Sequence, residues 1–164
     1  MSTIRYVAMP TEIAEAYRAG APDANGQAPE RYISDGSGVP CRHCLGEVAA
    51  GEPYLLLAHR PFPAAQPYAE LGPVFLHAEA CERYPAAGGI PPMLFDRRRV
   101  ILRGYGADHR IVDGTGQVVA VEAIPEVAAA LFARPGVACV HVRSATNNCF
   151  ICRIERAEQG RRAA

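Results

Sequence analysis

The most informative absences in this 164-residue sequence are lysine, net charge and long apolar segments. All 17 basic residues are arginine, so the protein has no lysine for Schiff-base chemistry or for the phosphate loop of a nucleotide-binding enzyme. The formal net charge is zero, which argues against a protein built mainly to bind nucleic acid or an anionic membrane. No segment approaches the roughly 18 consecutive apolar residues that a membrane-spanning helix needs.

Nothing near the N-terminus is typical of a secretory signal, because residues 1–9 contain no apolar stretch of sufficient length. We therefore expect a cytoplasmic protein. In a reducing compartment the six cysteines favour metal binding or free thiols over disulfides. Since 49% of the residues are apolar, we expect a single domain with a sizeable core over residues 1–156. A flexible, polar tail is expected over residues 157–164.

Four potential metal ligands form two pairs at the ends of one segment, residues 41–81. Cys41 and Cys44 form a Cys-x-x-Cys turn, and His77 and Cys81 follow two apolar, strand-like runs. Thiolates and imidazoles suit tetrahedral zinc, and a His and a Cys four residues apart share one side of a helix. The order of turn, hairpin and helix resembles a treble-clef zinc finger. We expect a structural zinc site, because four protein ligands leave no open position for catalysis.

Two other interpretations of these cysteines remain open. Free cysteines are often ordinary buried side chains, and a lone Cys-x-x-Cys pair is also typical of thioredoxin-like redox proteins. A redox pair belongs at the start of a helix after a buried strand, whereas residues 35–40 have the composition of a loop. The fourth ligand is also open, since His43 or His59 could replace His77.

Apolar periodicity elsewhere predicts a strand-rich α+β fold with a mostly antiparallel sheet and a few short helices. The strand at 53–59 is expected to be buried on both faces because its apolar run is nearly continuous. Residues 20–40 and 85–95 are rich in glycine and proline and are expected to be irregular. The expected strands are 4–9, 53–59, 73–76, 100–105, 110–112 and 117–119, and the expected helices are 11–19 and 125–134.

Residues 137–156 have the pattern of a β-hairpin with one polar face. We predict a three-residue loop, 146–148, with Asn148 in the left-handed conformation. This register points Cys149 and Cys152 to opposite sides, so the second Cys-x-x-Cys motif is not expected to bind a metal. One face then holds Val140, Val142, Ser144, Phe150, Cys152 and Ile154, and the other holds Cys139, His141, Arg143, Cys149, Arg153 and Glu155.

Two functions are compatible with these patterns. The first is a zinc-stabilised binding or interaction module, since no nucleophile with an adjacent base is evident. The alternative is an enzyme or anion-binding protein in which His141, Arg143 and Arg153 bind an anionic group, with His141 as acid or base. The same face could instead carry ordinary cross-strand ion pairs to Glu155. The expected partner is a protein or a small anionic ligand, with no nucleic acid and no membrane.

Several short motifs occur in an order that resembles one known family. They are Pro40-Cys41-Arg42-His43-Cys44, Leu55-Leu56-Leu57, Gln66-Pro67-Tyr68 leading to Gly72-Pro73-Val74-Phe75, and the hairpin sequences 140–145 and 148–153. Together they resemble an uncharacterised bacterial family, domain of unknown function 1203, over residues 40–156. The resemblance implies a small, single-domain protein of the bacterial cytoplasm and supplies no activity or catalytic residue.

Overall fold

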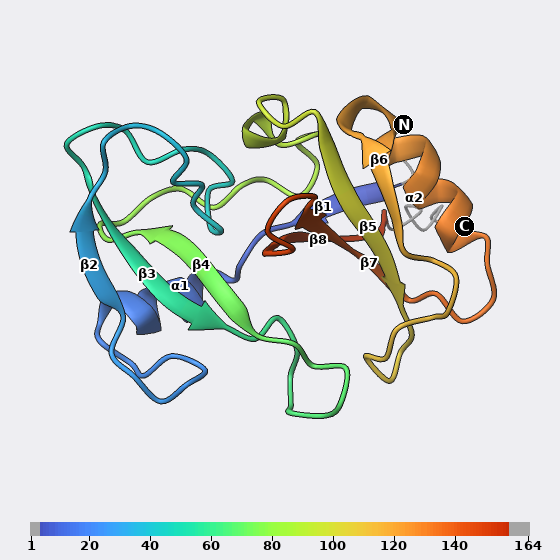
Figure 1. Ribbon diagram of the computed structural model, residues 1–164, viewed down its shortest axis with the longest axis horizontal. Helices are drawn as coiled ribbons and strands as arrows, with labels where there is room; N and C mark the ends of the chain where they lie inside the picture. Colours follow the sequence, from blue (N-terminus) through green and yellow to red (C-terminus); the bar gives the residue numbers. More distant parts are fainter. Residues whose placement is uncertain (1–3, 158–164) are drawn as a thin grey trace, which may run out of the picture.

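Two antiparallel β-sheets lie side by side in the computed structural model, which describes residues 4–157 (Figure 1). The larger sheet has the strand order β1-β8-β7-β5-β6, and the smaller has the order β2-β3-β4. The strands are β1 (Ile4–Val7), β2 (Glu30–Ile33), β3 (Pro53–His59), β4 (Gly72–His77), β5 (Arg99–Tyr105), β6 (Gln117–Ala120), β7 (Cys139–Ser144) and β8 (Phe150–Arg156). The helices are α1 (Thr11–Arg18) and α2 (Ile124–Phe132), with the 3-10 turns η1 (Pro92–Leu94) and η2 (Val121–Ala123).

This architecture confirms the predicted α+β class with antiparallel sheets and short helices. Within residues 4–157, none of the helices combines the length and the apolar character needed to cross a membrane. Residues 158–164 of the predicted tail lie outside the described residues. The single-domain organisation stays a prediction.

Helix α2 covers one face of the larger sheet and forms the main core with it. Pro125 in its first turn has a backbone angle already suited to a helix, and Gly136 with φ of 85° follows its end. Alternate residues of β5 and β7 point toward the helix, as the two-residue period of a strand requires. The buried residues that meet there include Ile124, Ala128 and Leu131 from α2 and Val100, Leu102, Val140 and Val142 from the sheet.

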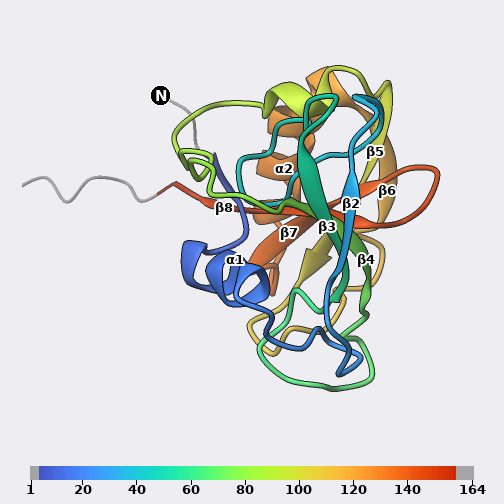
Figure 2. The same cartoon turned by 90° about the vertical axis from the view of Figure 1, so that its left-hand side faces the viewer.

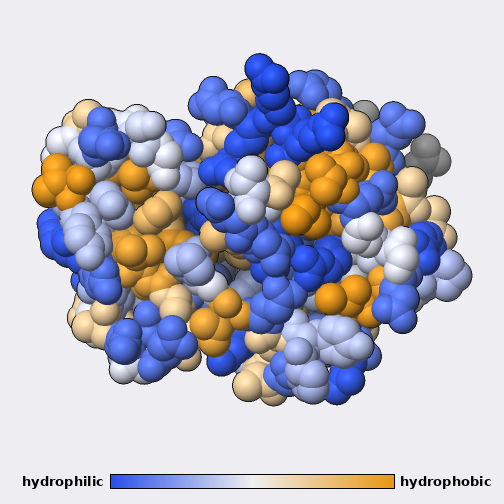
Figure 3. All heavy atoms as spheres, viewed as in Figure 1, coloured by the Kyte–Doolittle hydropathy of each residue, from blue (hydrophilic) through white to orange (hydrophobic). Residues whose placement is uncertain are grey.

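The smaller sheet is buried on one face only. Leu55 and Leu57 of β3 are buried, whereas Tyr54 and Leu56 are half-buried, so the expectation of burial on both faces was wrong. Figure 2 shows α1 against one face of this sheet. On the opposite face Tyr54 contacts Phe75, with ring centroids 5.4 Å apart, and Figure 3 shows apolar side chains gathered over β3 and β4.

Strand β2 lies within residues 20–40, which were expected to be irregular. All four of its residues are exposed, so the segment carries no buried period that could identify it as a strand. It forms because its backbone pairs with β3 in antiparallel register, with Tyr32 opposite Tyr54. The expected strand at 110–112 is reduced to an isolated bridge between Ile111 and Tyr105.

The β7–β8 hairpin has a β-bulge and a four-residue loop, 145–148, so the predicted three-residue loop, 146–148, was wrong. Ser144 donates its N–H to the carbonyl of Cys149 and accepts from Asn148, whose φ of 57° is left-handed as predicted. Val142 pairs with Cys152 and Arg143 with Phe150, which leaves Ile151 as the additional residue. The bulge restores the predicted register beyond it but turns Phe150 away from the core face, where it was expected.

Candidate functional site

The cysteine and histidine side chains predicted to bind metal converge on one point. One ligand atom from each of Cys41, Cys44, His77 and Cys81 lies within 4.8 Å of all the others. The two sulfurs of Cys41 and Cys81 are 3.9 Å apart, and Sγ of Cys44 is 3.5 Å from Nδ1 of His77. Tetrahedral zinc bonds of 2.0–2.3 Å place ligand atoms about 3.3–3.8 Å apart. Only small side-chain shifts therefore separate this arrangement from a four-ligand metal site.

The first pair of ligands lies in a tight turn beside β4. Cys41 accepts the N–H of Leu45 and donates its own to the carbonyl of Gly46. Leu45 has a φ of 52° although it is not a glycine, and its side chain is fully buried in the main core. A leucine persists in this conformation only where the surrounding structure fixes it. The turn is also hydrogen bonded to β4 through the N–H of Arg42 and the carbonyl of Phe75.

The second pair does not lie on a helix, and this part of the treble-clef expectation was wrong. His77 is the last residue of β4, and residues 78–81 form a bend followed by irregular chain. Backbone hydrogen bonds hold this segment, because Ala78 donates to Pro53 and Tyr84 donates to His43. The ligands therefore converge through the edge of a sheet and a pinned loop, and not through the turn of a helix.

Polar side chains around the cluster hydrogen bond to its members. Arg18 of α1 donates Nη2 to Sγ of Cys81 over 3.2 Å and Nε to the carbonyl of His77 over 3.0 Å. Nδ1 of His43 is 3.1 Å from Sγ of Cys81, and its Nε2 is 2.9 Å from the hydroxyl of Thr11. Among the described residues, His77 is thus the imidazole inside the four-residue cluster, and His43 is a hydrogen-bond partner of a cysteine in it.

The remaining candidate for the fourth ligand, His59, is occupied elsewhere. Its Nδ1 is hydrogen bonded to the hydroxyl of Tyr17 over 3.2 Å. Burial, and then the charge of Arg42, lower the pKa of His59 to about 4, so its ring is neutral near pH 7.

The three sulfurs lie too close together to ionise independently. Hydrogen bonds from the thiols of Cys44 and Cys81 lower the pKa of Cys41, and the same bonds, followed by burial, raise the pKa of Cys44 and Cys81. A divalent cation between the sulfurs would favour the thiolate at all three positions and release protons on binding. The arrangement can therefore hold one metal ion.

The predicted polar face of the hairpin is covered by residues 60–71, the connection between β3 and β4. His141 is only 1% exposed and lies among the rings of Phe62, Tyr105 and Phe150, with centroids 5.1, 4.3 and 5.0 Å away. Burial, and then the charge of Arg143, lower the pKa of His141 to about 3. The imidazole is neutral and enclosed, so the acid–base role stays a prediction without structural support.

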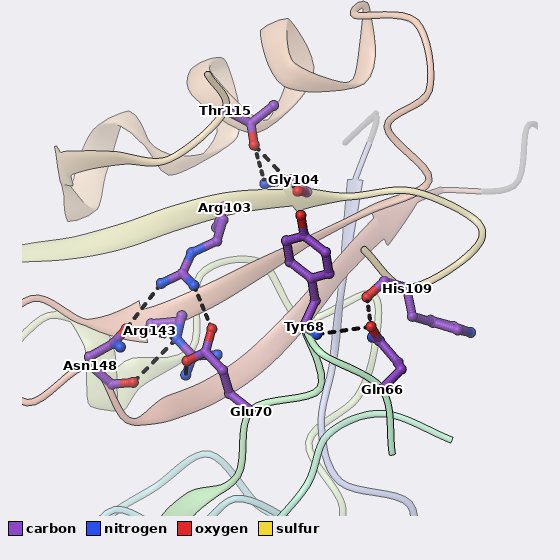
Figure 4. Close-up of polar contacts among 9 residues, drawn as sticks. All are labelled: Gln66, Tyr68, Glu70, Arg103, Gly104, His109, Thr115, Arg143 and Asn148. Atoms are coloured by element: carbon purple, nitrogen blue, oxygen red, sulfur yellow. Dashed lines mark hydrogen bonds and ion pairs between the residues drawn. The ribbon is translucent and has the colours of Figure 1, made fainter. Parts of the chain in front are cut away.

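Arg143 takes part in a network that fastens this connection to the larger sheet (Figure 4). Glu70 lies 2.7 Å from Arg103 and 3.0 Å from Arg143, and Oδ1 of Asn148 accepts from Nε of Arg143 over 2.9 Å. Gln66 donates to the carbonyl of His109 over 2.9 Å and accepts the N–H of Tyr68. The sequence pattern of the hairpin did not indicate Glu70 or Gln66; the only signal near them was the Gln66-Pro67-Tyr68 motif.

Arg153 lies apart from His141 and Arg143 in its contacts. Its Nη2 is 2.9 Å from Glu155, which also pairs with Arg5 of the neighbouring strand β1 at 2.6 Å. The expected cross-strand ion pair to Glu155 is thus present. The three residues predicted to bind an anion together have three environments: an aromatic enclosure, an ion-pair network and a partly exposed ion pair.

The order of these features along the chain agrees with a comparison against protein families. Residues 38–156 match the family described as "Protein of unknown function (DUF1203)", a range that includes all four residues of the metal cluster, Glu70 and the β7–β8 hairpin. No curated protein and no solved structure matches the chain. Because the family match extends over most of the 164 residues, the chain belongs to the DUF1203 family.

Proposed function

We propose that the protein is a cytoplasmic binding module whose smaller sheet is stabilised by a structural zinc ion. The observation that carries the metal assignment is the convergence of four ligand atoms, from the turn at 41–44, the end of β4 and the loop after it, within 4.8 Å. Three thiolates and one imidazole favour zinc over magnesium or calcium, which prefer oxygen ligands. A reducing cytoplasm keeps the cysteines available as ligands.

The metal would hold together a turn that also contacts the larger sheet. Arg42, between the two cysteines of the turn, is 3% exposed and donates Nε to the carbonyl of Phe150 over 2.7 Å. Its Nη1 donates to the carbonyl of Pro40 over 2.6 Å. Burial lowers the pKa of Arg42 to about 10, which still leaves it charged at neutral pH. A metal ion that fixes Cys41 and Cys44 would therefore also fix the position of Arg42, whose guanidinium joins the two sheets.

The binding role is supported by buried arginine Nε groups that have no hydrogen-bond acceptor among the described residues, at the junction of the two sheets. Within residues 4–157, Arg60 makes no hydrogen bond and no ion pair, and its buried Nε has no partner. The buried Nε of Arg153 also has no partner. Buried polar groups are nearly always hydrogen bonded in folded proteins. These donors favour a small anion over a protein partner as the ligand.

Ligand substitutions in the full-length protein test the metal assignment. Cys41→Ser, Cys81→Ser and His77→Ala should each lower both the zinc content and the melting temperature. Cys139→Ser is the matched control, because Cys139 is buried on the larger sheet and should leave the metal in place. A His77→Ala protein that keeps its zinc while His43→Ala loses it would contradict the proposed ligand set.

A further inference from the structure

A cavity of about 310 Å³ lies between the start of α1, the residues that follow β3, and strand β8. Its lining includes the apolar side chains of Met9, Ile13, Phe62 and Phe150. Met9, Phe62 and Phe150 are buried, whereas Ile13 is 38% exposed. Small-ligand sites typically begin at about 300 Å³ and are mostly apolar with a few placed polar groups. The cavity has this composition, because its cationic lining comes from Arg60 and Arg153.

The two arginines bring unsatisfied donors to the same cavity. The Nε atoms of Arg60 and Arg153 are both buried and have no hydrogen-bond partner within residues 4–157. A buried N–H without an acceptor is costly, and for a charged group the cost is greater still. Because both residues line the cavity, an acceptor with negative charge placed there would lie beside two cationic side chains.

The charges around the cavity leave a positive excess. Glu155 is the acidic residue of the lining, and its carboxylate is already shared between Arg5 at 2.6 Å and Arg153 at 2.9 Å. Arg60 has no carboxylate partner within the described residues. His59, which also lines the cavity, is neutral at pH 7 because burial lowers its pKa to about 4. Within the lining, one carboxylate therefore faces two guanidinium groups, and that carboxylate is also paired with Arg5 outside the cavity.

We propose that this cavity binds a small monocarboxylate with an apolar body, whose carboxylate accepts from Arg60 and Arg153 and whose body packs on Phe150 and Ile13. A volume of about 310 Å³ corresponds to roughly ten water volumes, which fits a ligand of about ten non-hydrogen atoms. The mostly apolar lining matches a single charged group better than a polyanion. The inference names the ligand of the proposed binding role and retains only Arg153 from the three ligand-binding residues expected from sequence.

The carbonyl of Phe150 accepts a hydrogen bond from Arg42, so one lining residue of the cavity is held by the metal-binding turn. The cavity should therefore be tested in zinc-replete protein. Octanoate is a suitable probe, because it has ten non-hydrogen atoms and one carboxylate. Octanamide keeps the apolar body without the charge, and acetate keeps the charge without the body.

Isothermal titration calorimetry with the full-length protein should show saturable binding of octanoate. Octanamide and acetate should each bind at least about tenfold more weakly, since each loses one of the two interactions. Arg60→Met should weaken octanoate binding by about tenfold or more, because it removes a charged donor that has no other partner. Arg31→Met is the matched control, since Arg31 lies on β2 and pairs with the exposed Glu79.

A second variant covers the possibility that Arg60→Met disturbs folding. Ile13→Asp places a carboxylate at the exposed rim of the cavity, near the start of α1 where an acidic residue suits the helix. It should abolish octanoate binding with little change in melting temperature. Equal affinity of wild type, Arg60→Met and Ile13→Asp for octanoate, or no binding to zinc-replete wild type, would overturn the inference. Zinc measured on the same samples separates this outcome from a failure of the metal assignment.

Discussion

Glu70 is the most informative residue to substitute, because its one carboxylate pairs with two arginines of the larger sheet. Oε1 lies 2.7 Å from Arg103 and Oε2 lies 3.0 Å from Arg143. Each hydrogen bond to a charged group contributes about 1.5–3 kcal/mol. The side chain of Arg143 is only 6% exposed, but that of Glu70 is 36% exposed, so solvent weakens both pairs. We expect Glu70→Gln to lower the free energy of unfolding by about 2–3 kcal/mol.

Urea and thermal unfolding measure this loss directly. For a chain of this length, about 2–3 kcal/mol corresponds to a fall in melting temperature of roughly 5–10 °C. Glu79→Gln is the matched control, because Glu79 and its partner Arg31 have side chains 71% and 55% exposed. The control should stay within about 0.5 kcal/mol of wild type. If both variants unfold at the same midpoint as wild type, Glu70 does not fasten the connection to the larger sheet.

Two further predictions concern a buried histidine and the thiols of the cluster. The pKa of His141 is about 3 in the folded chain and about 6.5 in the unfolded chain. Below pH 6.5 the unfolded chain therefore binds more protons, and the free energy of unfolding decreases as the pH is lowered. His141→Phe should remove about 2 kcal/mol of the loss between pH 7 and pH 5, measured by urea unfolding at both values, and an unchanged loss would contradict the burial of a neutral ring. Cys41, Cys44 and Cys81 should react slowly with an alkylating reagent until a chelator is added, as mass spectrometry of the labelled protein can show. Rapid labelling of Cys41 in metal-replete protein would favour the redox interpretation instead.

The sequence correctly predicted which four residues form the metal cluster, but it did not correctly predict the secondary structure that carries the second pair. The spacing of Cys41 and Cys44 suits one ion in any tight turn, so the pair could be identified without knowledge of the fold. The four-residue spacing of His77 and Cys81 suggested a helix, but a strand end followed by a bend also brings both side chains to one point. Long-range hydrogen bonds such as that from Tyr84 to His43 decide between these forms, and local sequence does not contain them.

The polar hairpin face shows a second limit of local patterns. Alternation along β7 correctly places His141 and Arg143 on the face opposite the main core. It cannot show that residues 60–71, which connect two strands of the smaller sheet, cover that face and bring Glu70 to Arg143. It also cannot show the bulge at Ile151, because an additional residue in a strand leaves no composition signal. Phe150 therefore lines the cavity and packs on His141, and it is not part of the main core.

The metal content of the wild-type chain tests the central claim most directly. The full-length protein would be purified under reducing conditions from a zinc-sufficient culture, with no metal added and no chelator used, and its metals measured by mass spectrometry. The proposed site predicts about one zinc per chain, released when the thiols are modified or the solution is made acidic, because protons compete for all four ligands. Metal-free protein with the same melting temperature before and after zinc is supplied would contradict the claim and leave the cysteines as buried side chains.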